Sequence, residues 1–392
     1  MSPSQQSVLI GFADALAAPE AAASLLGASY RVVSFARRGR PAPLRRLHGV
    51  EVMEVTAPEE DFAACAAEVA ALAAEHDATM PLDDPAVLVC DRGLRPDSPV
   101  VGPRGAQARL ALDKRLQLAG AETAGFAVPR WAELPLGAGL PKEWAPPVVL
   151  KPALAVEVPD GRVRRLSPRG AGTAEELEDL RRSWGPSTPA IVQRWVPGTG
   201  AGVFGLAEGG AVHHLSAHRR VRMMNPAGSG SSACASTPVP QKLIAPVERL
   251  LGAAGWHGMF MVELLYSGDE WWFMELNGRP WGSLALARRL GHEYPAWAVA
   301  RALDAQAPLP QAPAFEDLLC RHLGREMIHL LFVLRGPGSH IGPWPGRGQT
   351  LRALLRGGRR TAWYNLGPGM RGVFLEDTWR TVVEQTRGRR RA

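Results

Sequence analysis

The sequence predicts an α/β protein built from more than one domain. Short apolar segments alternate with alanine-rich helical segments over residues 7–82, and this alternation is typical of parallel strands joined by helices. From about Gln107 the pattern changes, and apolar strands begin to carry single charged residues. The length of 392 residues exceeds what one small hydrophobic core accommodates, so we expect two or three packed units.

The N-terminal elements follow from hydrophobic periodicity. Apolar runs predict strands at 7–12, 30–35, 50–55 and 78–82, and alanine-rich runs predict helices at 17–26 and 59–76. Strands that alternate with helices pair in parallel, so we expect a doubly wound sheet. The first turn lacks the GxGxxG fingerprint, and a dinucleotide site is therefore not indicated there.

A second set of elements follows. The pattern predicts helices at 106–119 and 171–184, the latter capped by Thr173, strands at 148–152 and 189–196, and a glycine-rich stretch at 198–210. Lys151 lies in the apolar strand VVLKP, where a cation is costly unless an anion meets it. The alternative is a strand-end lysine that reaches water. For Lys114, in LDKRLQLAG, the alternative is an ordinary charge on a helix face.

A predicted hairpin carries the most informative residues. Its strands cover 259–266 and 271–276, and residues between them have turn chemistry. If the loop is 267–269, Glu263 opposes Phe273, and Glu275 is its diagonal neighbour on the same face, at roughly 7–8 Å between Cβ atoms. A loop of two or four residues would instead place the two glutamates on opposite faces.

Glu275, Asn277 and Arg279 alternate along the chain, so a strand would present all three on one face. Glu263 and Glu275, with Asn277 just beyond, form a set of oxygen ligands suited to Mg²⁺ that is shared with substrate phosphates. The alternative is a pair of surface glutamates on an amphipathic hairpin.

Residues 218–222 (HRRVR) place Arg220 and Arg222 on one face of an expected strand, an arrangement that suits phosphate or carboxylate. A solvated run of charge is the alternative. The Gly/Ser loop at 225–232 offers backbone N–H groups to an anion or is simply flexible.

The C-terminal region predicts a mostly buried helix at 315–335, a short basic helix near 350–356 and a final helix at 375–386. We expect this region to cap the unit that precedes it in the chain. In the N-terminal unit, the strand predicted at 78–82 runs into the acidic residues Asp83 and Asp84.

Composition excludes several classes of protein. Apolar residues make up 46% and charged residues 21%, values typical of a folded globular chain. The net charge of +7 includes Arg387, Arg389, Arg390 and Arg391 near the C-terminus. A basic surface can attract nucleic acid, but no stretch interleaves basic and aromatic residues, and phosphate-bearing small molecules explain basic clefts equally well. We therefore expect no nucleic-acid partner.

Cysteine usage and hydropathy indicate a cytoplasmic protein. Cys65, Cys90, Cys234 and Cys320 are scattered without CxxC or zinc spacing, as expected of reduced thiols. The first residues lack the basic and apolar regions of a signal peptide, and no apolar run approaches the ~20 residues that span a bilayer. We expect no membrane partner.

Taken in order, these motifs resemble the ATP-grasp superfamily, and most closely its predicted carboxylate–amine ligases. The resemblance rests on Asp113-Lys114, VVLKP, VQRWVPG, HRRVR with its Gly/Ser loop, WHGMFMVE and MELNGRPWGSLALA. It implies a Rossmann-like pre-ATP-grasp domain, a small ATP-binding lobe, a large antiparallel-sheet lobe with the metal site, and a helical C-terminal extension. The corresponding boundaries are 1–105, 106–190, 191–308 and 309–392.

The resemblance also implies roles for individual residues toward ATP and Mg²⁺, with Mn²⁺ as a substitute metal. Lys114 and Lys151 would contact the ATP phosphates. The adenine slot would be lined by Gln193, Trp195 and Val196. The metal would be held by Glu263, Glu275 and Asn277. The acyl phosphate would be stabilised by Arg279 and Arg220.

Two departures from the family pattern accompany this resemblance. Residues 197–202 offer no acid for the ribose hydroxyls, and Gly278 stands where relatives often have proline. The implied activity is ATP-dependent amide or peptide bond formation from a small carboxylate and an amine, with an amino acid or peptide as substrate; a homodimer is compatible with it. Transfer to another nucleophile, phosphorylation of bicarbonate, and a non-catalytic nucleotide-binding regulator are the alternatives.

Overall fold

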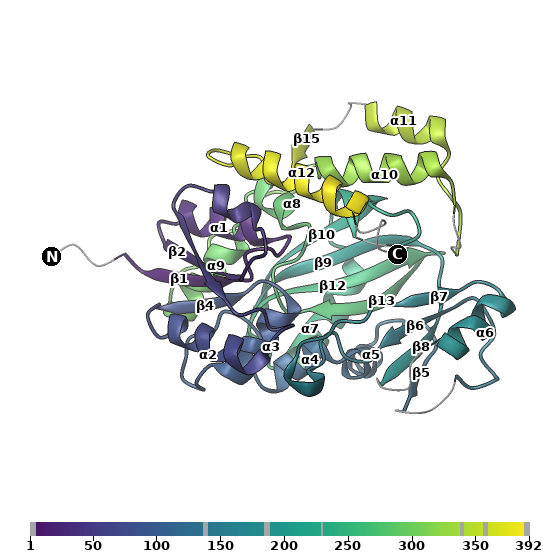
Figure 1. Cartoon of the computed structure of the whole chain (residues 1–392), viewed down its shortest axis with the longest axis horizontal. Coiled ribbons are helices and arrows are strands. Elements are labelled where there is room, and N and C mark those ends of the chain that lie inside the picture. The colour runs from purple at the N-terminus through teal and green to yellow at the C-terminus, as the bar shows by residue number, and fades with distance from the viewer. Residues whose placement is uncertain are drawn as a thin grey trace.

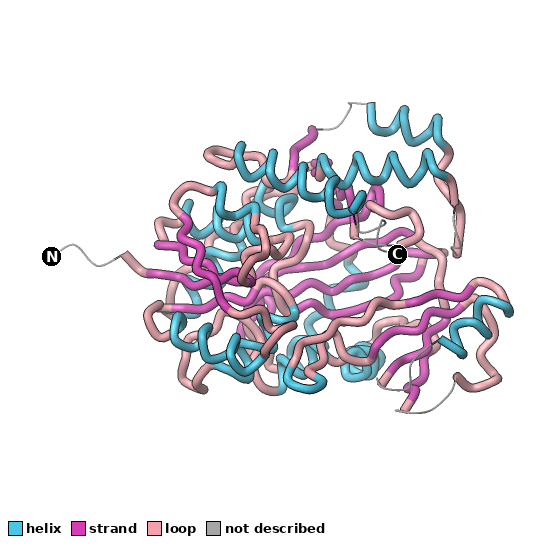
Figure 2. The backbone as a smooth tube through the Cα atoms, viewed as in Figure 1, coloured by secondary structure: helices cyan, strands magenta, loops and turns pink. Residues whose placement is uncertain are grey.

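The computed structural model describes residues 5–135, 140–183, 189–228, 230–337, 341–355 and 360–387. Within these residues the strands form three sheets (Figures 1 and 2). Predictions that concern Trp184, Ser229, Arg356 and Arg389 to Arg391 lie outside the described part. No helix among the described residues is both long and apolar enough to cross a membrane.

The N-terminal domain is the predicted doubly wound unit. Its parallel sheet has the order β3-β2-β1-β4. The strands are β1 (Ser7–Gly11), β2 (Arg31–Arg37), β3 (Val50–Val55) and β4 (Ala78–Pro81). The helices are α1 (Ala18–Gly27), α2 (Phe62–Ala73) and α3 (Asp84–Gly93), with a short 3-10 turn η1 (Pro43–Arg46). Both faces are covered, because Ile10 packs toward α1 whereas Leu9 packs toward α2 and α3.

The small lobe carries an antiparallel sheet of order β5-β8-β6-β7. Its strands are β5 (Trp131–Leu134), β6 (Val148–Pro152), β7 (Arg169–Ala171) and β8 (Ala190–Arg194). Its helices are α4 (Ala106–Leu112), α5 (Lys114–Thr123), α6 (Ala174–Ser183) and the turn η2 (Pro159–Gly161). The single helix predicted at 106–119 is wrong: Asp113 has extended backbone and caps α5 by accepting a bond from the Arg115 N–H. Thr173 caps α6 as predicted, accepting from the Glu176 N–H.

A seven-stranded sheet of order β13-β12-β9-β10-β11-β14-β15 forms the large lobe. Its first five strands in the chain are β9 (Thr199–Glu208), β10 (Ala211–Met223), β11 (Ser231–Thr237), β12 (Gly258–Ser267) and β13 (Glu270–Asn277). Helices α7 (Gln241–Ala253), α8 (Leu284–Arg289) and α9 (Tyr294–Leu303) complete it. Phe260 and Val262 of β12 pack toward α5 and α7, whereas Met259 and Met261 pack toward the N-terminal domain and α9.

The C-terminal region is only partly helical. It contains β14 (Leu318–Arg321), α10 (Leu323–Arg335), α11 (Arg347–Leu355), β15 (Arg360–Trp363) and α12 (Arg371–Arg387). The helix predicted at 315–335 is therefore wrong at its start, where Leu318–Arg321 pairs with β11 and extends the large sheet. This strand and β15 belong to the same sheet as the hairpin of β12 and β13, so the region beyond residue 308 completes the large lobe as well as capping it (Figure 1).

Candidate active site

The hairpin places Glu263 and Glu275 directly opposite each other, by a different route from the predicted one. The turn has two residues, Gly268 and Asp269, both with positive φ, as in a type I′ turn. A regular ladder from this turn would pair Glu263 with Met274. Instead Met274 is an extra residue, a β-bulge between the pairs Leu264–Phe273 and Glu263–Glu275. The predicted three-residue loop and diagonal pairing are wrong, but the shared face is confirmed.

Deleting Met274 is expected to leave Glu275 opposite Glu263. Removal of the extra residue gives a regular ladder in which Leu264 still pairs with Phe273 and Glu263 with Glu275. MgADP affinity should therefore be retained in the deletion variant. The matched control Met274→Ala keeps the bulge and should also retain it. Loss of MgADP affinity in the deletion variant, but not in Met274→Ala, would contradict this register.

The two carboxylates differ in their surroundings. Burial and the neighbouring Glu275 raise the pKa of Glu263, although Arg220 donates to it from Nη2 at 2.5 Å. Burial would also raise the pKa of Glu275, but Lys114 and other nearby cations hold it below its ordinary value. Lys114 Nζ lies 3.4 Å from Glu275 Oε2, and Asn277 Nδ2 lies 3.3 Å from Glu275 Oε1. Five of the predicted site residues therefore meet at one end of the hairpin: Lys114, Arg220, Glu263, Glu275 and Asn277.

A glycine allows Arg220 to reach Glu263. Arg220 lies on β10 and Glu263 on β12, and β9 runs between them. A Cβ added at Gly200 of β9 would lie 2.6 Å from Arg220 Cδ. The arginine side chain thus crosses β9 where the strand has no side chain, which gives the predicted glycine-rich stretch a structural role.

Arg222 does not join this cluster, although the sequence analysis paired it with Arg220. A register irregularity separates the two residues. Arg222 donates from Nε and Nη2 to Glu326 of α10, at 2.9 and 2.7 Å. Arg222 therefore anchors α10 to β10.

Gln117 was missed by the sequence analysis. This buried residue of α5 accepts a hydrogen bond from the Leu276 N–H and donates one to the Leu276 carbonyl, both at 3.0 Å. It thereby holds the end of β13 against α5, the helix that supplies Lys114. The sequence signal that could have identified Gln117 was its position three residues after Lys114, which predicts the same face of the same helix.

Lys151 lies on β6 without a carboxylate partner among the described residues. Its Nζ donates to Oε1 of Gln193 on the neighbouring strand β8 at 2.7 Å. Burial and the positive charge of Lys114 lower the pKa of Lys151 to about 8. Gln193 is buried, and its Nε2 has no hydrogen-bond partner within the described part of the chain. Both side chains therefore retain bonding capacity for a ligand.

Trp195 and Val196 follow β8 and are half-buried. The Trp195 N–H donates to the Pro147 carbonyl at 3.1 Å. A Cβ added at Gly342 would lie 3.3 Å from the Trp195 ring, so the segment after α10 packs against the predicted adenine hinge.

Arg279 is held by the N-terminal domain. Its Nε donates to Asp84 Oδ1 at 2.7 Å, and Arg165 Nη2 donates to the other oxygen at 2.9 Å. Burial alone would raise the pKa of Asp84, but Arg279 and Arg165 hold it below its ordinary value. Asp84 is the first residue of α3, which Asp83 caps. The Asp83–Asp84 turn thus positions a site arginine, a role that the strand-end pattern alone did not reveal.

A cavity of about 630 Å³ lies beside this cluster. Its wall combines the N-terminal domain, the large sheet and the start of α10. The ionisable lining residues are Asp14, Arg37, Arg40, Glu59, Asp83, Arg165, His218, Arg220, Glu263, Arg279 and Arg325. Lys114, Lys151 and Gln193 are not part of this wall, so the cavity and the two lysines lie on different sides of the cluster.

His218 lines the cavity but does not act as a cation there. Ser283 Oγ lies 2.9 Å from its Nδ1, and burial together with Arg220 lowers its pKa to about 3. It is therefore neutral at physiological pH.

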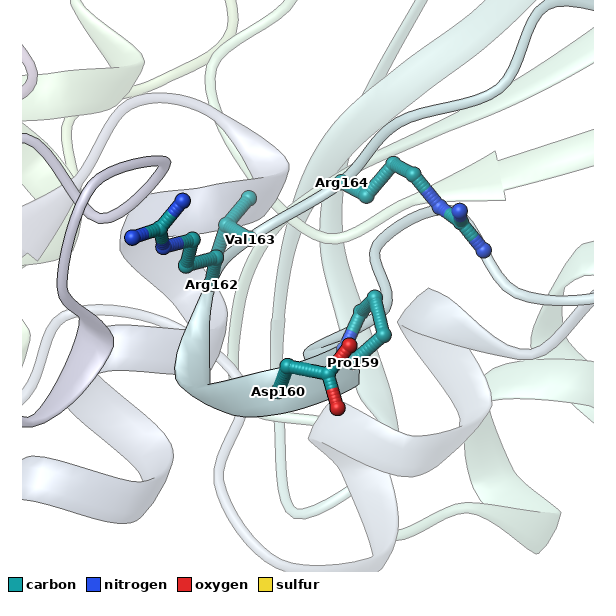
Figure 3. A pocket seen from close by; sticks show the side chains of 5 residues that line it. All are labelled: Pro159, Asp160, Arg162, Val163 and Arg164. Carbon is teal, nitrogen blue, oxygen red and sulfur yellow. The ribbon is translucent and has the colours of Figure 1, made fainter.

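A second hollow, of about 410 Å³, lies over η2 and the residues that follow it. In Figure 3 the side chains of Arg162 and Arg164 point away from each other on its two sides. None of the predicted site residues lines it, so it is separate from the candidate site.

The donor set fits a magnesium ion shared with phosphates. The described residues contain no group of three or more His, Cys, Asp or Glu side chains arranged to hold a metal by themselves. Glu263, Glu275 and Asn277 supply two carboxylates and one amide, all hard oxygen ligands. Mg²⁺ typically takes one or two carboxylates and completes its shell with water and substrate phosphates.

Comparison with solved structures finds chains that share this fold at low sequence identity. The L-amino acid ligase of Bacillus licheniformis is 18% identical, with a TM-score of 0.58 over 78% of this chain and 75% of that chain. N5-carboxyaminoimidazole ribonucleotide synthetase, solved with ADP, is 14% identical, with a TM-score of 0.61 over 88% of this chain and 91% of that chain. The biotin carboxylase domain of Hydrogenobacter thermophilus 2-oxoglutarate carboxylase, solved with MgADP and bicarbonate, is 15% identical, with a TM-score of 0.58 over 78% and 71%. No family model and no curated protein matches the sequence.

Proposed function

We propose that this chain, which has the ATP-grasp fold, is an ATP-dependent ligase that joins a carboxylate to an amine and releases ADP and phosphate. One observation carries the proposal: Glu263 and Glu275 face each other between two lysine-bearing elements on one side and an arginine-lined cavity on the other. Such an arrangement suits a reaction in which the γ-phosphate of ATP meets a second anionic substrate. The amino acid ligase among the structural neighbours favours an amine as acceptor.

The proposed nucleotide side lies at the small lobe. Lys114 and Lys151 would bind ATP phosphates, and Gln193, Trp195 and Val196 would line the adenine slot. Glu263, Glu275 and Asn277 would hold Mg²⁺, for which Mn²⁺ would substitute. When bound, the metal would neutralise phosphate charge and orient the γ-phosphate. The contact to the ribose stays unassigned, because residues 197–202 carry no acid.

The proposed substrate side lies at the cavity. A carboxylate oxygen attacks the γ-phosphorus of ATP, the bond to the β–γ bridging oxygen breaks, and ADP leaves with its electron pair. Arg279 and Arg220 offset the charge of the acyl phosphate that forms. A neutral amine then attacks the acyl carbon, the bond to the phosphate oxygen breaks, and phosphate leaves. The nitrogen gives one proton to the departing phosphate or to water as the amide forms.

The segment before β7 is suited to exclude water from the acyl phosphate. Val163 packs in a cluster with α3 and its N–H donates to the Pro58 carbonyl at 2.7 Å. Arg165 binds Asp84 and lines the cavity. The small lobe thus reaches the N-terminal domain across the mouth of the proposed site.

The function is tested by incubating the protein with MgATP and pools of carboxylates and amines. ADP formation that requires both partners supports the ligase. ADP formation with bicarbonate alone, or with a non-amine acceptor, would support the corresponding alternative. AMP formation, or no product above background in every mixture, would overturn the proposal, and nucleotide binding without turnover would indicate a regulator.

ATP affinity is expected to fall as pH rises through about 8. Lys151 has a pKa of about 8 in the nucleotide-free protein, and only its protonated form attracts phosphate. Between pH 7 and 9 the protonated fraction drops about tenfold, and the Kd for MgATP rises by a similar factor. Lys151→Arg keeps its charge over this range and should flatten the profile. Calorimetric titration of both proteins with MgATP at several pH values measures the Kd. If the Kd of the variant depended on pH as steeply as that of the wild type, Lys151 would not be the phosphate-binding group.

A further inference from the structure

Arg325, from the C-terminal region, lines the cavity and has no ion-pair partner among the residues that the structure describes. It lies in the first turn of α10, and its Nη1 donates to the Ser231 carbonyl at 3.2 Å. The Ser231 carbonyl carries no charge, and this is the one hydrogen bond that the guanidinium makes within the described residues. Four of its five N–H donors are therefore available to other groups.

The other five arginines of the cavity wall are neutralised by carboxylates. Their ion pairs join Arg37 to Asp14, Glu59 and Asp83, Arg40 to Glu59, Arg165 and Arg279 to Asp84, and Arg220 to Glu263. No such pair involves Arg325 in the part of the chain that the structure describes. The nearby Asp377 carboxylate is already engaged, since it lies 3.0 Å from His322 Nε2 and accepts from Asn365 Nδ2 at 2.9 Å.

The guanidinium is seated against the main chain. A Cβ added at Gly230 would lie 2.8 Å from Arg325 Nη1, so a glycine there permits the close approach. Burial lowers the pKa of Arg325, with a smaller contribution from the positive charge of Arg220. A partly buried cation of this kind is costly unless an anion completes it.

We propose that Arg325 binds a second carboxylate of the substrates, distinct from the one that ATP phosphorylates. This inference rests on the proposed function. The reacting carboxylate belongs beside Glu263 and Arg279, whereas Arg325 enters the cavity from α10 and the start of β11. A cavity of about 630 Å³ has room for more than one carboxylate. A bidentate carboxylate–guanidinium contact would then select an acidic or amino-acid substrate.

Two sources can supply this carboxylate: the α-carboxylate of an amino-acid acceptor, or the far end of a dicarboxylic donor. Both are tested by thermal unfolding in the presence of MgADP. The probes are the pooled L-amino acids, the matching pool of amino-acid amides, and succinate with glutarate. We expect stabilisation by the amino acids or by the diacids and none by the amides.

The stabilisation should vanish in Arg325→Gln and return in part in Arg325→Lys. The matched control is Arg335→Gln at the exposed end of the same helix, which should behave as wild type. For a substrate pair found by ADP formation, Arg325→Gln should raise the KM of the carboxylate-bearing partner about 10- to 100-fold. The KM for ATP should stay unchanged.

Some results would overturn the role of Arg325. They are stabilisation that persists in Arg325→Gln, equal stabilisation by amides, or no stabilisation by any probe in the wild type. The ligase proposal fails independently of this role if the probes bind to the protein but no ADP is formed. MgADP affinity equal to wild type shows that each variant is folded.

Discussion

Glu275→Gln is expected to lose turnover by at least about 100- to 1000-fold while the protein stays folded. Glutamine keeps the size of the side chain but lacks the charge needed to hold Mg²⁺ beside the phosphates. Glu275 also lies 3.4 Å from Lys114 and opposite Glu263. Removing it relieves one repulsion and breaks one attraction, so we expect a change in the free energy of unfolding of about 1 kcal/mol or less.

The measurements are kcat in the ADP-release assay, MgADP affinity by calorimetry, and the midpoint of urea unfolding. The matched control is Glu270→Gln, an exposed glutamate at the other end of the same strand, which should change none of them. A Glu275→Gln enzyme with normal kinetics in magnesium would show that the metal assignment is wrong. A large loss of stability would show that the residue is structural instead.

Arg279→Gln is expected to reduce both activity and stability. The guanidinium is the group best placed to offset acyl-phosphate charge, and its loss should lower kcat about 100- to 1000-fold. The same change removes a cation from the largely buried Asp84, at a cost of about 3 kcal/mol in the free energy of unfolding. Arg165 still binds Asp84 and limits this cost.

The double variant Asp84→Asn/Arg279→Gln separates the two effects. Neutralising both partners removes the unpaired charge, so stability should recover toward wild type while kcat stays low. Arg95→Gln serves as the control, because its ion pair with Asp97 is exposed to solvent. Recovery of turnover in the double variant would show that Arg279 acts only by neutralising Asp84.

The N-terminal sheet could be predicted because each of its signals is local. Apolar runs mark the strands, alanine-rich runs mark the helices, and short connections leave parallel pairing as the outcome. Strand 50–55 has the predicted bounds, and the other strands differ by one or two residues at their ends. The same reasoning failed at 106–119, where the side chain of Asp113 ends one helix and begins the next.

The hairpin shows how a correct conclusion can follow from an incorrect register. The shorter turn and the bulge each shift the ladder by one residue in the same direction, and a total shift of two residues keeps Glu275 on the face of Glu263. Nothing in the local sequence marks Met274 as the extra residue. The expectation that both carboxylates hold one metal ion, and therefore share a face, predicted their arrangement better than the length of the turn did.

The sequence by itself determined the strands of the N-terminal sheet and the chemical character of the candidate site: two carboxylates and an amide, two lysines, and arginines near a glycine-rich stretch. Only the tertiary structure decided which of these groups meet and which partners orient them. Arg279 and Asp84 are 195 positions apart, Gln117 and Leu276 are 159 apart, and Arg325 reaches the cavity because β14 joins the large sheet. Local periodicity extends over a few residues, whereas these contacts depend on how separate sheets pack.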